Sequence, residues 1–265
     1  MTGARERLRS TFDGAAILYD EARPGYPAGL FDAVVSLSGI PSGGRILEVG
    51  CGTGQATVPF ARRGYGILCV ELGENLAAVA RRNLAGYPGV EVRVADFEKT
   101  PLPEGAFDLV VSATAFHWLD PAVAYRKAAR CLRPGGAIAL FWNEHVHSDA
   151  SGAFFEAGQK VYAREAPEIW DNDHEDPPRP EDLPDRAAGI ENSGLFGPVV
   201  RRSFRWDQQY DTAGYLRVLD TYSGHASLGN ETRQRLYAGL SRLIEEYGGR
   251  VVKGYQTSLY VARKR

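Results

Sequence analysis

The stretch EVGCGTG (residues 48–54) ends a short apolar run, residues 45–50, and opens a helical pattern over residues 53–63. Its alternating glycines allow a tight turn and let a ligand approach the backbone closely. The helix that follows offers free backbone N–H groups to an anionic ligand group. This stretch therefore predicts a loop that binds a nucleoside cofactor.

The residues around this loop alternate between strand and helix patterns. Residues 74–86 and 120–132 have apolar residues at spacings of three and four, which predicts helices. The glycines after Arg133-Pro134 mark the end of the helix predicted over 120–132. Apolar runs rich in strand-forming residues occur at 45–50, 66–72, 90–96, 107–114 and 136–144. This alternation predicts an α/β fold, a mostly parallel sheet covered on both faces.

The segments outside this core predict covering elements. Residues 10–38 predict two helices, broken at residues 23–27 because each proline there forces its predecessor into an extended backbone. We expect that break to be the hinge of a lid. Residues 146–190 lose the alternation and predict a solvated insertion rich in proline. The C-terminal part predicts strands over 198–206 and 251–265 and helices over 212–224 and 231–247.

Composition excludes several classes of protein. The chain has 265 residues, 44% of them hydrophobic and 24% charged, which is typical of a globular protein. The net charge of −2 and the lack of a basic block argue against nucleic-acid binding. We see no membrane-length apolar run and no secretory leader, so we expect a cytoplasmic protein. Neither the three cysteines nor the acidic residues of 171–176 predict a metal site.

Two positions bear on the choice of cofactor. A dinucleotide fingerprint needs a third glycine at position 55, where this chain has Gln55. Glu71 ends the second predicted strand, and its carboxylate can accept hydrogen bonds from both hydroxyls of a ribose. Gln55 therefore argues against an NAD-type oxidoreductase. Glu71 supports the binding of a nucleoside cofactor but does not distinguish one such cofactor from another.

Glu48 followed by glycines at every second position resembles the first motif of class I S-adenosylmethionine-dependent methyltransferases. Asp96-Phe97 resembles the adenine site of that family, and residues 133–136 resemble its L-x-P-G-G turn. The resemblance implies a doubly wound, Rossmann-like sheet of seven strands in the order 3-2-1-4-5-7-6, the last antiparallel. It also implies S-adenosylmethionine as cofactor, S-adenosylhomocysteine as product, and in-line methyl transfer to an O, N or C nucleophile of a small molecule.

The N-terminal segment from Phe12 to Pro27 resembles a subgroup that includes trans-aconitate, ubiquinone and natural-product methyltransferases. In that subgroup the segment covers the cofactor. The resemblance implies that Tyr19 lies near the methionine part and that Arg23 pairs with its carboxylate. The expected cofactor-binding residues are Tyr19, Arg23, Glu48, Gly50, Cys51, Gly52, Gly54, Glu71, Leu72, Asp96, Phe97 and Ala113.

The end of the fourth predicted strand carries His117 and Trp118. Ligands of open α/β sheets bind at the carboxyl ends of the strands, so both residues are expected at the cleft. His117 is a candidate general base, since its ordinary pKa lies near neutral pH. The alternative is that His117 only hydrogen-bonds the lid or the start of the adjoining helix. Trp118, Trp142 and Asn143 are expected to form walls of the substrate pocket.

We expect one overall domain: a helical lid (1–40), a cofactor-binding core (41–145), and the remaining sheet with substrate-pocket insertions, including a helical one before the last strand (146–265). The expected partner is a small molecule, with no membrane or nucleic acid, and the chain is expected to be a monomer or homodimer. Two alternative functions remain open at this point. One is an NAD-type oxidoreductase, and the other is a protein that binds S-adenosylmethionine without transferring its methyl group, as an interaction protein or a cyclase.

Overall fold

The computed structural model describes residues 13–14, 16–150, 152–170 and 177–265. Phe12 and the other predicted helical positions before residue 13 lie outside the described residues. The acidic cluster at 171–176 lies outside them as well.

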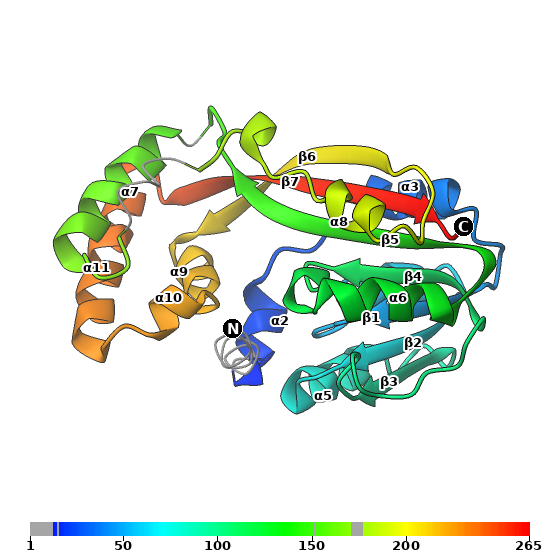
Figure 1. The fold of residues 1–265 in the computed structure, drawn as a ribbon. Coiled ribbons are helices and arrows are strands. Elements are labelled where there is room, and N and C mark those ends of the chain that lie inside the picture. The colour runs from blue at the N-terminus through cyan, green and yellow to red at the C-terminus, as the bar shows by residue number, and fades with distance from the viewer. Residues whose placement is uncertain (1–12, 15, 151, 171–176) are drawn as a thin grey trace.

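The centre of the molecule is one seven-stranded sheet with the order β3-β2-β1-β4-β5-β7-β6 (Figure 1). Strands β1 to β5 pair in parallel, whereas β7 runs antiparallel to both β5 and β6. The predicted fold class and strand order are confirmed. The strands are β1 (Arg45–Val49), β2 (Gly66–Glu71), β3 (Val90–Val94), β4 (Phe107–Ala113), β5 (Leu132–Val146), β6 (Val200–Asp211) and β7 (Arg250–Arg263).

Helices cover both faces of this sheet. One hydrophobic cluster joins β1, β4 and β5 to α6 and α8, and a second joins the opposite face of the same strands to α3, α4 and α5. Such two-sided burial explains why the central strands are continuous apolar runs. These helices are α3 (Ala28–Ser38), α4 (Thr57–Ala61), α5 (Glu74–Asn83), α6 (Pro121–Cys131) and α8 (Ala187–Asn192).

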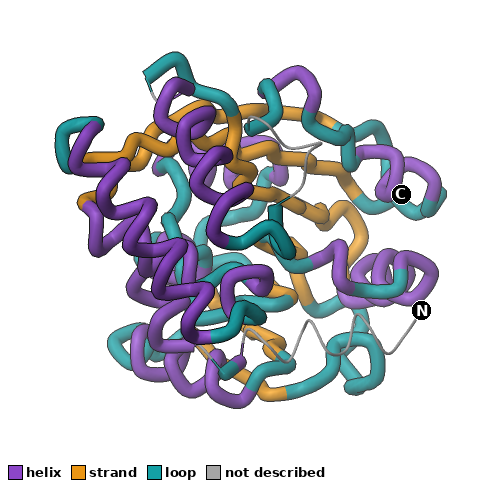
Figure 2. Tube along the Cα trace, turned by 90° about the vertical axis from the view of Figure 1, so that its left-hand side faces the viewer, coloured by secondary structure: helices purple, strands orange, loops and turns teal. Residues whose placement is uncertain are grey.

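Helices α7 (Gly152–Glu165), α9 (Thr212–Asp220), α10 (Ser223–Ala226) and α11 (Asn230–Glu246) gather at one end of the long strands β5, β6 and β7 (Figures 1 and 2). A third hydrophobic cluster joins α7, α9 and α11 to Val251 at the start of β7. In the described part of the chain, no helix is both long and apolar enough to cross a membrane. The short helices α2 (Ala16–Ala22), η1 (Phe116–Trp118) and η2 (Pro180–Asp182) lie elsewhere in the fold.

The structure corrects several predicted boundaries. The helix expected over 53–63 begins only at Thr57, because the preceding glycines adopt left-handed backbone angles that no right-handed helix contains. Residues 146–190 are not a purely solvated insertion, since α7 buries Phe154 and Val161. The strand predicted over 198–206 starts at Val200 and continues to Asp211, directly before the helix predicted from residue 212.

Candidate functional site

The glycine loop closes the carboxyl end of β1. Gly50, Gly52 and Gly54 have φ angles of +71°, +56° and +91°, which L side chains rarely adopt. A Cβ atom at Gly50 would lie 2.5 Å from the Cβ of Ala115, at the end of β4. Glycine is therefore required both by the turn and by the close approach of the two strand ends.

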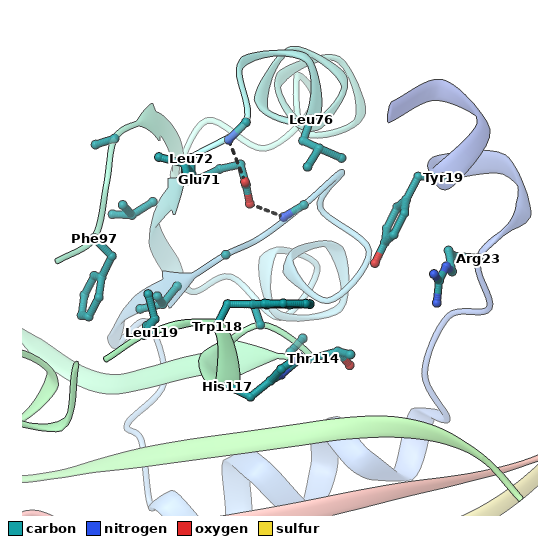
Figure 3. A pocket seen from close by; sticks show the side chains of 18 residues that line it. Tyr19, Arg23, Glu71, Leu72, Leu76, Phe97, Thr114, His117, Trp118 and Leu119 are labelled. Carbon is teal, nitrogen blue, oxygen red and sulfur yellow. Dashed lines mark hydrogen bonds between the residues drawn. The ribbon is translucent and has the colours of Figure 1, made fainter. Parts of the chain in front are cut away.

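Glu71 holds this loop from the end of β2. Its carboxylate accepts hydrogen bonds from the backbone N–H groups of Gly52, at 2.8 Å, and Gly73, at 2.9 Å (Figure 3). Burial raises the pKa of Glu71, although these backbone hydrogen bonds oppose the shift. A carboxylate has about four acceptor positions, so two stay available to a ligand.

A cavity of about 210 Å³ lies in front of Glu71. Tyr19 and Arg23 face it from the N-terminal segment, across from Glu71, and Phe97 and Leu119 close one end (Figure 3). Ten of the predicted site residues share this cavity: Tyr19, Arg23, Gly50, Gly52, Glu71, Leu72, Phe97, Ala113, His117 and Trp118.

Other predicted residues lie beside the cavity without lining it. Asp96 accepts a hydrogen bond from the backbone of Glu98 and forms a 3.0 Å ion pair with Lys99, while its neighbour Phe97 faces the cavity. Gly54 and Cys51 belong to the loop but do not line the cavity. The structure therefore gives these three residues supporting positions.

Glu48 lies beneath the loop with only 1% of its surface exposed. Cys69 donates to its carboxylate through a sulfur–oxygen contact of 3.9 Å. Burial raises the pKa of Glu48 to about 7, and the nearby charge of Glu71 adds to the shift. Glu48, predicted to bind the cofactor, does not line the cavity and instead packs under the loop.

We expect the Glu48→Gln variant to change how stability depends on pH. The raised pKa means that the folded wild-type protein keeps a proton on Glu48 that the unfolded chain loses above pH 4.5. Wild-type stability should therefore fall as pH rises from 4.5 to about 7, by at most about 3 kcal/mol from this group. Urea unfolding across this range should show a flatter profile for Glu48→Gln than for wild type. The exposed Glu246→Gln is the control, and equal slopes for all three proteins would refute the assignment.

The N-terminal segment is attached to the core by polar contacts. Asp13 accepts hydrogen bonds from the backbone N–H groups of Asn75, at 2.8 Å, and Leu76, at 3.0 Å, in the first turn of α5. The amide of Gln55 donates to the backbone carbonyls of Asp20 and Arg23. The residue that replaces the third glycine of a dinucleotide fingerprint therefore fixes this segment over the loop.

A second cavity of about 320 Å³ adjoins the first, and the two share Tyr19, Arg23 and Thr114. Asn143, predicted to be a pocket wall, lines this second cavity and donates to the carbonyl of Gly25 at 2.7 Å. The other lining residues are Pro24, Tyr26, Gln55, His145, Tyr222, Lys253 and Tyr255.

Trp142 does not form a wall of either cavity, which corrects its predicted position. It is buried in β5, and its indole Nε1 donates to His117 Nδ1 at 3.0 Å. In a neutral imidazole one nitrogen accepts and the other carries the proton. His117 Nε2 is therefore the protonated nitrogen in this arrangement, which favours a hydrogen-bonding role over that of a base.

Several cavity residues were not found from the sequence. Thr114 has a φ angle of +53°, which is unusual for a β-branched residue, and its hydroxyl hydrogen-bonds Tyr26 at 3.1 Å. Lys253, Tyr222 and Tyr255 come from segments far along the chain. No local sequence motif marks these residues as part of the site. The one available signal was for Thr114, which ends a predicted apolar strand.

Residues 47–140 match the family model described as a methyltransferase domain. An uncharacterized methyltransferase of Mycobacterium tuberculosis is 34% identical over 143 residues, covering 54% of this chain and 56% of that protein. Residues 47–140, which contain the glycine loop and Glu71, are therefore similar to methyltransferase domains. The chain spans about half the length of the curated relatives that it matches first.

Solved structures share the fold of the chain. A protein of Anaeromyxobacter dehalogenans, described as a candidate type II methyltransferase, has a TM-score of 0.62 at 23% identity and covers 91% of this chain and 97% of its own. Phosphoethanolamine N-methyltransferase 2 of Haemonchus contortus, solved with S-adenosyl-L-methionine, has a TM-score of 0.57 at 17% identity and covers 100% of this chain and 60% of its own. The predicted family resemblance is confirmed.

Proposed function

We propose that this chain transfers a methyl group from S-adenosylmethionine to a small-molecule acceptor. The observation that carries the proposal is the pair of adjoining cavities. The first contains the glycine loop and Glu71, and the second opens from it at Tyr19, Arg23 and Thr114. Such an arrangement lets one ligand meet another at a shared boundary with little water between them.

The residues of the first cavity suit the parts of the cofactor. The two free acceptor positions of Glu71 match the ribose hydroxyls, and Phe97 with Leu119 suits a flat adenine ring. Arg23 suits the methionine carboxylate, because its Nε is buried without a hydrogen-bond partner in the described part of the chain. Each part of the cofactor thus meets a group of matching chemistry.

The bound cofactor supplies an electrophilic methyl group on a sulfonium centre. The chain has to hold the acceptor in line with that group and keep water away, which can lower the barrier by several kcal/mol. Tyr19 lies at the boundary of the two cavities, where an aromatic face tolerates a nearby positive charge. His117, held by Trp142, fixes the edge of the site.

A methyl-transfer assay tests the proposal. The full chain would be incubated with S-adenosylmethionine labelled in its methyl group and a library of small acids, phenols and amines, and labelled products would be identified by mass spectrometry. Labelled product that forms only with the intact enzyme supports methyl transfer. Cofactor binding without any transfer across the library would favour the non-transferring binder.

The Glu71→Ala variant should bind the cofactor more weakly. Hydrogen bonds to a charged group contribute about 1.5 to 3 kcal/mol, so the dissociation constant for S-adenosylhomocysteine should rise about 10- to 150-fold. Calorimetry measures the change. Glu74→Ala, three residues further on and outside the cavity lining, is the matched control. A folded Glu71→Ala protein with unchanged affinity would remove Glu71 from the cofactor site.

The His117→Gln variant separates the two roles considered for this histidine. Because His117 Nδ1 accepts a hydrogen bond from Trp142, we expect a hydrogen-bonding role, and glutamine should keep single-turnover transfer within about tenfold of wild type. A general base would instead contribute about 10² to 10⁴ to the rate. A loss in that range at unchanged cofactor affinity would show that His117 removes a proton from the acceptor.

Three finer expectations belong to this proposal. The acceptor is a small molecule, the enzyme is cytoplasmic, and it is a monomer or a homodimer. The near-neutral net charge and the second cavity of about 320 Å³ support the first of these. The division at residues 40 and 145 also remains a prediction.

A further inference from the structure

Two basic side chains line the second cavity, and none of the described residues that line it is acidic. Lys253 is only 3% exposed, and Arg23 is partly buried. Within the described ranges, neither residue forms a salt bridge. The described lining of the cavity therefore carries positive charge and no acidic side chain.

Lys253 has unused hydrogen-bonding capacity. Its ammonium has three donors, and the structure shows one hydrogen bond, to the hydroxyl of Tyr222 at 3.1 Å. The ring centroids of Tyr222, Tyr255 and Tyr215 lie 5.3, 5.7 and 6.0 Å from Lys253 Nζ. These rings stabilise the cation but supply no negative charge and no hydrogen-bond acceptor for its other two N–H groups. A buried ammonium costs several kcal/mol without a partner, so its position favours an anionic ligand.

Neighbouring groups respond to this positive charge. Burial alone would raise the pKa of Tyr222, yet the charges of Lys253 and Arg23 and the hydrogen bond from Lys253 lower it. Burial, and then the charge of Lys253, hold the pKa of His145 well below its ordinary value. His145 is therefore neutral and adds no further positive charge to the cavity.

The two cations face different parts of the site. Arg23 lines both cavities, whereas Lys253 lines only the second. If the cofactor carboxylate pairs with Arg23, as the proposed function requires, Lys253 is left without an anionic partner. The second anion must then come from the acceptor.

The walls of the second cavity indicate the shape of that acceptor. Tyr26 packs edge-on against Phe141 at 5.2 Å between ring centroids, and its hydroxyl is held by Thr114. Tyr222 and Tyr255 flank Lys253, and Pro24 adds a further apolar surface. These rings suit a flat, largely apolar body better than a flexible polar chain.

We propose that the second cavity binds the methyl acceptor as a small planar organic anion, whose carboxylate or phosphate group pairs with Lys253. The inference rests on the proposed function, because it assigns the acceptor side of the same site. Lys253 is a binding residue in this proposal and takes no part in moving the methyl group.

The test uses the full chain saturated with S-adenosylhomocysteine and three probes of similar shape, which are benzoate, phenyl phosphate and the neutral benzamide. Calorimetric titration measures each dissociation constant for wild type, Lys253→Met and Lys264→Met. Lys264 is the matched control, since it follows the other end of β7 and does not line the cavity. Thermal unfolding verifies that each variant is folded.

At least one anion should bind wild type and Lys264→Met ten or more times more tightly than benzamide, and the better of the two identifies the acidic group. Lys253→Met should reduce that ratio to within twofold while its affinity for S-adenosylhomocysteine stays within twofold. No anion preference in wild type, or a preference that survives in Lys253→Met, would overturn the inference. A wild-type protein that does not bind S-adenosylhomocysteine would instead refute the proposed function.

Discussion

Gly52→Val should weaken binding of S-adenosylhomocysteine at least 100-fold while the sheet stays folded. Gly52 lines the first cavity with a φ angle of +56°, where a β-branched residue is strained by about 1 to 3 kcal/mol. The nearest atom to an added Cβ is Tyr19 Cε1, at 3.9 Å, so the side chain fits only by entering the space between the loop and Tyr19. That space is where the cofactor is expected.

Gly64→Val is the matched control for backbone strain. Gly64 has a φ angle of +81°, an added Cβ there meets nothing within 4 Å, and it does not line either cavity. Both variants should lose stability in urea by similar amounts, but only Gly52→Val should lose cofactor binding by calorimetry. Equal affinities for the two variants would mean that the cofactor does not approach the glycine loop.

Deletion of residues 1–24 should also lower the affinity for the cofactor at least 100-fold. The deletion removes Tyr19 and Arg23, which form one wall of the first cavity, and with Arg23 the expected partner of the cofactor carboxylate. The sheet should remain folded, because α2 buries only Ala16 and Ala22 and the packing of Tyr26 on Phe141 is kept. Calorimetry measures the affinity, and hydrogen exchange should rise in residues 28–38.

Gln55→Ala provides a graded form of the same experiment. It removes the two hydrogen bonds that fix the N-terminal segment and leaves Tyr19 and Arg23 in place. Each hydrogen bond contributes a net stabilisation of about 0.5 to 1.5 kcal/mol, so a loss of several-fold in cofactor affinity is expected for Gln55→Ala.

For the deletion of residues 1–24, a truncated protein that binds the cofactor as tightly as the full chain would show that this segment does not cover the cofactor.

The parts of the fold that could be predicted are those encoded locally. The apolar runs located β1, β2, β4 and β5 within a few residues, since strands buried on both faces tolerate few polar residues. Glu71 was found because it ends a predicted strand, and Phe97 was found through the resemblance of Asp96-Phe97 to the adenine site of the methyltransferase family. The late start of α4 was missed, because the sequence does not reveal how many glycines adopt left-handed angles before a helix begins.

The second cavity could not be predicted, because it is assembled by long-range pairing. The register of β7 against β5 places Tyr255 opposite His145. Tyr222, directly before α10, accepts a hydrogen bond from Lys253 of β7. A shift of one residue in that register would turn Lys253 to the other face of the sheet. Trp142 was wrongly expected to line the pocket. Its position near the end of a predicted strand did not reveal that its indole Nε1 donates a hydrogen bond to His117 Nδ1.

The most direct test of the central claim is a calorimetric titration of the full chain with S-adenosylhomocysteine and, separately, with NAD⁺. The structure predicts one binding site for S-adenosylhomocysteine per chain and no saturable heat with NAD⁺. Saturable binding of NAD⁺, or no binding of S-adenosylhomocysteine by the folded chain, would contradict the account.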